Sequence, residues 1–138
     1  MPTGKPVVEG LFAETGAGPR LLGSRCASCG AAYFPKGAIC HNPDCTESKM
    51  EDAEFGPKGK LWSLAIQTYP PPPPAKYDEP YKPYAMGVID LDDGLRVLGR
   101  LSGNDLKVQP GVAVELVLEP LYHEKDGTAV ITWKFKPV

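Results

Sequence analysis

Four cysteines lie in one short window of the sequence, and they are the only ones it contains: Cys26, Cys29, Cys40 and Cys45. The first two form a CxxC pair, and a segment of hairpin length separates them from a second, wider pair. Two close pairs of thiols at this separation are typical of a tetrahedral zinc site, with each sulfur about 2.3 Å from the ion. Gly30 follows the first pair, where a knuckle turn favours a residue that tolerates positive φ. The spacing predicts a zinc ribbon over residues 26–45 with all four thiolates as ligands.

Other uses of these cysteines fit the sequence less well. Two disulfides would require an oxidising compartment, and residues 1–10 lack the apolar run and cleavage site of a signal peptide. A redox-active dithiol needs one CxxC pair and leaves the second pair unexplained. His41 adjoins Cys40 and is left outside the ligand set, because adjacent residues rarely reach one tetrahedral ion together. Four protein ligands leave no position open for water, so the zinc is expected to be structural.

Five runs with a two-residue period follow the cysteine window and predict β-strands. Each run places its apolar residues on one face, and the runs cover residues 62–68, 84–91, 95–101, 112–119 and 129–135. Residues 92–94 (Asp-Asp-Gly) are typical of a tight hairpin turn between the second and third strands. Gly87 and Gly99, inside strands, favour sharp coiling or close backbone approach. Five such strands predict a small closed barrel, for which the OB-fold is the commonest five-stranded architecture.

The remaining segments complete a mainly β chain. Residues 6–15 carry apolar side chains at i, i+3 and i+4 spacing and predict a short helix, which residues 16–19 end. Residues 46–57 are polar and acidic and predict a linker. The expected fold is a rubredoxin-like zinc ribbon with a short N-terminal helix, followed by a five-stranded OB-fold barrel. The expected domains are an N-terminal helical lead-in (1–25), the zinc ribbon with its linker (26–57) and the barrel (58–138).

A proline-rich segment joins the first two predicted strands. Five consecutive prolines at 70–74 hold it extended, with little backbone entropy left to lose on folding. Tyrosines flank it, and tyrosine is enriched at interfaces because it offers a large apolar surface with one polar tip. The segment is either a solvated connector or, as we favour, a rigid arm that binds a partner or lines a ligand entrance. The candidate partner-binding residues are Tyr69, Tyr77, Tyr81 and Tyr84.

Composition and motifs argue against several classes of function. A net charge of −2 lacks the excess of positive charge that favours nucleic-acid binding. No stretch approaches the roughly 20 apolar residues of a membrane helix. The sequence contains two histidines, His41 and His123, and no HExxH, GxSxG or Walker motif. Because every thiol is assigned to metal, we expect no catalytic residue. The pattern favours a cytoplasmic binding or scaffold subunit over a stand-alone enzyme.

The order of these parts resembles one family, the small zinc-ribbon and OB-fold proteins that accompany thiolase-fold enzymes in acyl-CoA metabolism. The resemblance covers nearly the whole chain, residues 6–136. The wide second cysteine pair and the long proline arm depart from the family pattern. Besides the four cysteines and Gly30, the resemblance rests on residues 21–22, 33–35, 59–63, 83–90, 99–101 and 108–112.

The resemblance implies a non-catalytic accessory subunit, of which the small subunit of benzoylsuccinyl-CoA thiolase is an example. Its implied cofactor is structural Zn²⁺, and its implied partner is a thiolase-like catalytic subunit, in a heterotetramer of two small and two large subunits. The small subunit would dock on that partner and help form an acyl-CoA channel, with a CoA thioester as ligand of the complex. Neither nucleic acid nor membrane is expected as a partner. Four basic residues have two alternative roles, binding the CoA phosphates or remaining solvated at strand edges: Lys60, Lys82, Arg96 and Arg100.

Two other functions stay open at this stage. OB-folds and zinc ribbons also bind single-stranded nucleic acid, which requires a basic groove with stacking aromatic residues. Only Lys76 and Lys82 lie near the clustered tyrosines in the sequence. An autonomous thioesterase or CoA-binding enzyme would require a catalytic base, and none stands out.

Overall fold

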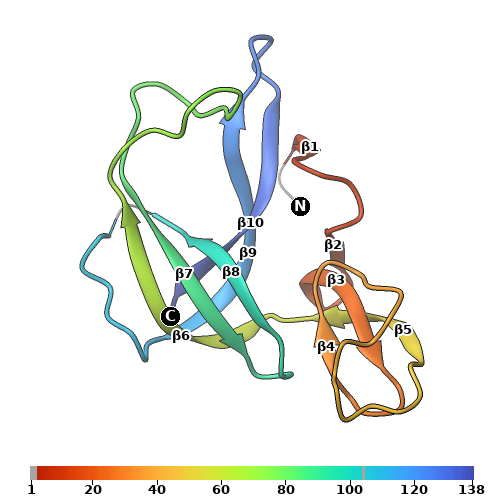
Figure 1. Ribbon diagram of the computed structural model, residues 1–138. Coiled ribbons are helices and arrows are strands. Elements are labelled where there is room, and N and C mark those ends of the chain that lie inside the picture. The colour runs from red at the N-terminus through yellow and green to blue at the C-terminus, as the bar shows by residue number, and fades with distance from the viewer. Residues whose placement is uncertain (1–2, 104) are drawn as a thin grey trace.

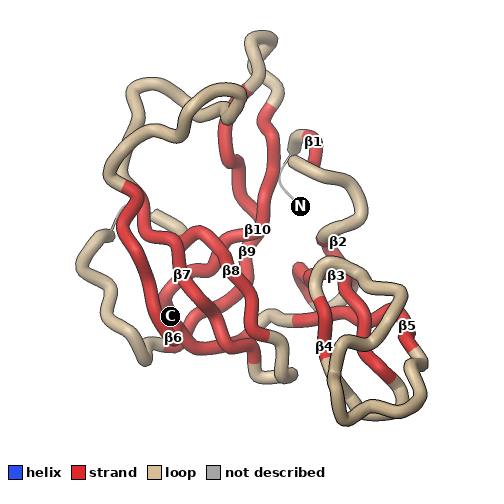
Figure 2. The backbone as a smooth tube through the Cα atoms, in the orientation of Figure 1, coloured by secondary structure: helices blue, strands red, loops and turns tan. Residues whose placement is uncertain are grey.

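All regular structure that the computed structural model describes, over residues 3–103 and 105–138, is β-strand (Figure 1; Figure 2). No helix with the length and apolarity of a membrane span occurs in those ranges. The strands form two sheets, one in the barrel and one in the ribbon. They are β1 (Lys5–Pro6), β2 (Phe12–Thr15), β3 (Gly18–Cys26), β4 (Ala32–Tyr33), β5 (Met50–Phe55), β6 (Lys58–Gln67), β7 (Tyr84–Leu91), β8 (Arg96–Leu101), β9 (Ala113–His123) and β10 (Ala129–Pro137).

Strands β6 to β10 close into a five-stranded barrel. Antiparallel pairs join β6 to β7, β7 to β8, β9 to β10 and β6 to β9. A parallel pair between β8 and β10 completes the ring, with Arg100 opposite Lys134 and Leu101 opposite Phe135. This closed barrel confirms the predicted OB-fold. Strand β1 adds a short parallel pairing to β10, so the N-terminal segment lies against the barrel (Figure 1).

The inward faces of the predicted strands fill the barrel. Ile89, Leu116 and Phe135 are among its fully buried side chains. A Cβ on Gly87 would lie 2.8 Å from Leu61 Cδ1, and a Cβ on Gly99 would collide with the Phe135 ring. These two glycines therefore allow the close approach that was predicted for them.

A bulge in β6 turns one predicted core residue outward. Simple alternation places Trp62 on the same face as Leu64 and Ile66. Instead, the register shifts between Leu61 and Ser63, as happens where a bulge inserts one extra residue into a strand. Leu61 is consequently 1% exposed and Trp62 57% exposed.

The second sheet belongs to the ribbon, and β3 is its central strand. Strands β2 and β4 pair with successive parts of β3, while β5 pairs with β3 from Leu21 to Cys26. Because Leu21 pairs with both Phe12 and Phe55, β2 and β5 lie on opposite sides of β3. Strand β4 follows directly after the first cysteine pair and the residues that close its loop.

Two predictions for the N-terminal half are wrong. Residues 6–15 form no helix, because Phe12–Thr15 pairs with β3 in an antiparallel hairpin and Gly10 adopts a φ of +84°. The apolar spacing there was short, and such short runs fit a helix or a strand equally well. Residues 46–57 contain β5 rather than a linker throughout. Its three acidic side chains, Glu51, Asp52 and Glu54, are exposed, while Phe55 is fully buried and anchors the strand.

An aromatic cluster packs the ribbon against the barrel. Trp133 of β10 contacts Phe12 and Phe34 from the ribbon side, with ring centroids 6.2 and 5.4 Å apart. The Trp133 indole N–H donates a hydrogen bond to the Leu98 carbonyl of β8 at 3.1 Å. One tryptophan thus links the barrel wall to two ribbon segments.

A polar contact joins the ribbon and the barrel at a second place. Asp93, in the turn between β7 and β8, accepts a hydrogen bond from the Gly56 N–H through its carboxylate (2.9 Å). Its backbone carbonyl accepts one from the Arg25 guanidinium (2.6 Å). Arg25 also donates to the Gly30 carbonyl (2.8 Å), directly after the first cysteine pair. The hairpin turn of the barrel is therefore connected to the zinc knuckle through one arginine.

Candidate functional site

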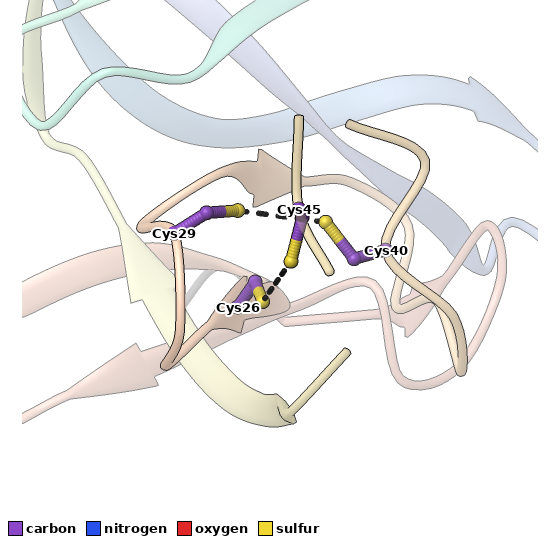
Figure 3. A group of neighbouring side chains, drawn as sticks. All are labelled: Cys26, Cys29, Cys40 and Cys45. Carbon is purple, nitrogen blue, oxygen red and sulfur yellow. Dashed lines mark hydrogen bonds between the residues drawn. The ribbon is translucent and has the colours of Figure 1, made fainter. Parts of the chain in front are cut away.

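The four predicted zinc ligands converge in the ribbon (Figure 3). The Sγ atoms of Cys26 and Cys45 are 3.8 Å apart, and those of Cys29 and Cys40 are 3.5 Å apart. All four sulfurs lie within 4.8 Å of one another. Sulfurs at tetrahedral positions about 2.3 Å from one zinc ion are separated by about 3.8 Å. The donor set and its spacing fit a zinc ion.

Backbone hydrogen bonds fix both cysteine loops. The Gly30 N–H donates to the Cys26 carbonyl at 2.7 Å, and the Cys26 N–H donates to the Ala31 carbonyl at 2.9 Å. Gly30 has a φ of +81°, which confirms the prediction for this position. The Cys45 N–H closes the wider second loop on the Asn42 carbonyl at 3.0 Å. Cys26 is held at the end of β3, and the loops position the other three thiols.

The thiols have very different acidities. Backbone hydrogen bonding at Lys49, and then at Cys29, lowers the pKa of Cys26 to about 6. Hydrogen bonding at the Glu47 backbone lowers the pKa of Cys45, but burial and the other three thiols outweigh it and raise this pKa to about 12. Four crowded thiolates repel one another, so a cation among them is required before all four can ionise. This chemistry is that of a metal site and not of one activated nucleophile.

Tyr33 separates His41 from the thiol cluster. The Tyr33 hydroxyl lies 3.3 Å from Cys40 Sγ and accepts a hydrogen bond from the His41 N–H at 2.8 Å. The His41 ring packs edge-on against Tyr33, with centroids 6.0 Å apart. The hydrogen bond from Tyr33 is the main reason that the pKa of Cys40 is lowered. Tyr33 thus contacts the cluster directly, a role that the sequence did not suggest.

Three of the four predicted partner-binding tyrosines lie together. Tyr77 and Tyr81 meet edge to face with centroids 5.4 Å apart, and Tyr81 and Tyr84 follow at 6.5 Å. Tyr69 is 84% exposed and shares no ring contact with them in the described part of the chain. The structure therefore assembles a row of three tyrosines, and their role in partner binding stays a prediction.

The second half of the proline arm is anchored to the barrel. The Tyr81 hydroxyl donates to the Gln67 carbonyl at 2.6 Å. The Asp78 carboxylate accepts the His123 backbone N–H and contacts His123 Nδ1, each at 2.7 Å. The side-chain and backbone hydrogen bonds from His123 lower the pKa of Asp78. In Figure 1 the arm accordingly crosses towards the β9–β10 hairpin, rather than extending away from the barrel.

An apolar groove of about 450 Å³ lies between the N-terminal segment and the outer barrel face. Val8 and Leu98 line it and are 53% and 60% exposed. Met86 and Trp133 contribute further apolar surface. Contiguous exposed apolar surface of this kind marks interaction sites. Sequence reasoning missed the groove because the period-two pattern does not show which outward residues the N-terminal segment approaches.

Comparison with known families accounts for both parts of the molecule. Residues 16–51 match the ChsH2 rubredoxin-like zinc ribbon domain, and residues 52–119 match the ChsH2 C-terminal OB-fold domain. The fold and the thiol cluster thus define a zinc-ribbon and OB-fold protein. This chain belongs to the ChsH2 family.

Curated relatives and a solved structure agree with that assignment. The DUF35 domain-containing scaffold protein of Methanocaldococcus jannaschii is 32% identical over 123 residues, 86% of this chain and 82% of the relative. Benzoylsuccinyl-CoA thiolase subunit BbsA of Thauera aromatica is 31% identical over 123 residues, 89% of this chain and 80% of the relative. The Ltp2-ChsH2(DUF35) aldolase structure matches with a TM-score of 0.63 and 25% identity, over 86% of this chain and 84% of that one.

Proposed function

We propose that this protein is a non-catalytic accessory subunit of a thiolase-fold enzyme that cleaves or forms C–C bonds in acyl-CoA substrates. In this proposal the chain docks on the catalytic subunit as a heterotetramer of two small and two large subunits. A zinc ion held by Cys26, Cys29, Cys40 and Cys45 keeps the ribbon folded, and a CoA thioester is the ligand of the complex.

Membership of the ChsH2 family is the observation that carries the proposal. One relative with this domain arrangement is named as a subunit of benzoylsuccinyl-CoA thiolase and another as a scaffold protein. The related solved structure pairs a ChsH2 protein with Ltp2 as an aldolase. From these names we infer a role beside a catalytic partner for this chain.

The chemistry of the described residues supports a non-catalytic role. The thiols face one another and fit zinc with no position left for substrate. His123 is paired with Asp78, and no serine or cysteine of the described ranges is hydrogen-bonded to its ring. A nucleophile and a base within hydrogen-bond reach are the usual signature of covalent catalysis. In the proposal, the nucleophile and the base that carry out catalysis belong to the partner subunit.

The apolar groove supports a role in forming the acyl-CoA channel. Its wall includes Leu98 and Met86 of the barrel and Leu11 of the N-terminal segment, and Arg100 also lines it. An apolar surface beside one cation suits a ligand with an apolar acyl part and anionic groups. We propose that this groove faces the catalytic subunit and lines the acyl part of the channel.

Affinity purification of the tagged chain from its native host tests the proposal. We expect one thiolase-fold protein at near-equal amount by mass spectrometry, with about one zinc per small subunit. Recovery of the chain alone would contradict the accessory role. Recovery with nucleic acid would instead favour the single-stranded nucleic-acid alternative.

A pair of leucine variants tests the groove separately. Leu98→Gln places an amide in the groove and should reduce recovery of the partner or its turnover of acyl-CoA. Leu106→Gln is the matched control, because Leu106 is also exposed (39%) but does not line the groove. Equal behaviour of the two variants would exclude the groove from the interface and the channel.

A further inference from the structure

Two cations face each other across neighbouring strands of the barrel. Arg100 of β8 and Lys134 of β10 are directly paired in the parallel ladder. Both side chains line the same cavity of about 280 Å³, so they point to the same side of the sheet. Like charges in directly opposed positions destabilise a sheet unless something compensates them. This pairing therefore requires an explanation.

Lys134 is unusually buried for a lysine. Its side chain is only 15% exposed, and lysine is almost never fully buried without a partner. Burial is the main cause that lowers the Lys134 pKa, and the Arg100 charge lowers it further, against an opposing contribution from Glu119. Burial and the neighbouring cation thus both disfavour the charged lysine.

The compensating carboxylate is only partly available. Glu119 Oε1 lies 3.7 Å from Lys134 Nζ, beyond hydrogen-bond distance. Both Glu119 oxygens accept from the Ser102 hydroxyl, at 2.8 and 3.0 Å, which orients the carboxylate. Glu119 therefore forms one long ion pair with Lys134, and no carboxylate of the described residues pairs with Arg100.

The Arg100 guanidinium is held in place without an acceptor. It stacks on the Tyr84 ring, with Cζ 3.4 Å from the ring centroid. Residues 3–103 and 105–138 include no oxygen that accepts a hydrogen bond from it. Stacking leaves the N–H edge of the guanidinium plane available, and this edge matches phosphate or carboxylate oxygens.

The other charged groups that line the cavity form no ion pair with Arg100 or Lys134 within the described residues. Lys82 adds a third cation, while Asp78 and Glu79 add two carboxylates. Asp78 is engaged by His123 at 2.7 Å through both its backbone N–H and its ring. Glu79 is exposed to solvent.

We propose that this cavity is a binding site for an oxyanion of the phosphate-ester class, held by the Arg100 fork and the Lys134 ammonium with Tyr84 supporting the arginine. The tetrahedral group would provide the hydrogen-bond acceptor that the Arg100 guanidinium lacks in the described part of the chain. The site does not depend on the proposed accessory function, because it is formed entirely by side chains of this chain. It lies beside the apolar groove, with which it shares Tyr84, Arg100 and Leu121.

Calorimetric titration of the full-length, zinc-loaded chain with pyrophosphate tests the site. We expect saturable binding that weakens about tenfold or more in Arg100→Met, since a charge-assisted, bidentate contact is lost. Lys134→Met should weaken binding as well, and Arg100→Lys should restore part of it by returning the charge without the fork. Arg96→Met is the matched control, because Arg96 lies on the same strand and pairs with Asp90 instead.

A parallel titration with succinate distinguishes phosphate from carboxylate as the source of the oxyanion. Tighter binding of succinate with the same variant pattern would retain the oxyanion site and assign it to carboxylates. Absence of saturable binding by either anion would overturn the proposal. Equal loss in Arg96→Met and Arg100→Met would also overturn it, because the binding would then reflect general surface charge. Zinc content and the thermal unfolding midpoint confirm that each variant is folded.

Discussion

The ribbon and the barrel are stabilised in different ways. In the barrel, five strands pair without a free edge, and most of the fully buried apolar side chains of the molecule lie there, Ile89, Leu116 and Phe135 among them. The ribbon buries few side chains, chiefly Leu21 and Phe55, and its long loop carries two of the four thiols. A sheet of that size gains too little from burial alone. The barrel can therefore fold by burial, while the ribbon needs a metal.

This difference separates the two parts of the proposed function. The barrel presents the tyrosine row, the apolar groove and the Arg100–Lys134 cavity on a frame that needs no cofactor. The ribbon contacts the groove through Trp133, a lining residue that packs against Phe12 and Phe34. Trp133 and Asp93 connect the two parts, so we expect disorder in the ribbon to change the structure of the groove.

Loss of one zinc ligand should disorder the ribbon and spare the barrel. Cys29→Ser removes an exposed thiolate without opening a cavity in the core. Because structural zinc contributes about 10 kcal/mol or more to the folding of small metal domains, β2 to β5 should lose protection from hydrogen exchange. Strands β6 to β10 should keep it. Ser28→Ala, between the two ligands, is the control, and unchanged protection of the ribbon in Cys29→Ser would refute the metal dependence.

Truncation of the barrel core should show the opposite pattern. Phe135 is fully buried, and Phe135→Ala should cost about 3–5 kcal/mol through lost transfer energy and an unfilled cavity. Denaturant unfolding measures this loss, and zinc content shows whether the ribbon keeps its metal. The neighbouring exposed residue supplies the control, Lys136→Ala. A loss of zinc at conditions where the barrel variant remains folded would argue against separate stabilisation.

Removal of the polar connection should uncouple the two parts. Asp93→Ala leaves the part-buried Gly56 N–H without its acceptor, at a cost of about 1–3 kcal/mol. We expect the ribbon and barrel transitions to separate when unfolding is followed by hydrogen exchange and tryptophan fluorescence. Asp92→Ala, one residue earlier and exposed, should leave them unchanged. Coincident transitions in Asp93→Ala would assign the coupling to Trp133 and to the Arg25 hydrogen bond with the Asp93 backbone carbonyl, which this substitution leaves in place.

Acid should weaken the anchoring of the proline arm by a small amount. His123 hydrogen bonds hold the pKa of Asp78 below its ordinary value of 3.8. The carboxylate therefore stabilises the folded arm above about pH 3.8, and this contribution is lost as the pH falls through the lower, folded value. Both side chains are about half exposed, so the effect should be a few tenths of a kcal/mol. Amide exchange in the arm that is equally slow in Asp78→Asn and wild type above pH 5 would contradict this anchoring.

Much of the barrel was predictable because each of its strands has one solvent-exposed face and one buried face. The alternation at Ala85, Ile89 and Leu91 agrees with their observed burial. The outward position of Trp62 was not predicted, because a bulge depends on how two strands pair. The sequence of one strand does not contain that information. The N-terminal helix was wrong for a related reason, since pairing with β3 overrode a weak local pattern.

The candidate site was predictable where chemistry fixes spacing, and unpredictable where it depends on tertiary contact. Thiols for one ion must lie close in sequence or on adjoining loops, so all four clustered cysteines were identified. Arg100 and Lys134 are 34 positions apart and meet only through the parallel pairing of β8 and β10. Nothing local in the sequence distinguishes them from solvated strand charges.

The most direct test of the account is acyl-CoA turnover by the purified thiolase-fold partner, measured with and without this chain. The account predicts that this chain alone shows no turnover, that the partner alone is inactive or nearly so, and that the two together are active. It further predicts that Cys29→Ser, purified without zinc, fails to restore activity. Turnover by this chain alone, or full activity of the partner without it, would contradict the account.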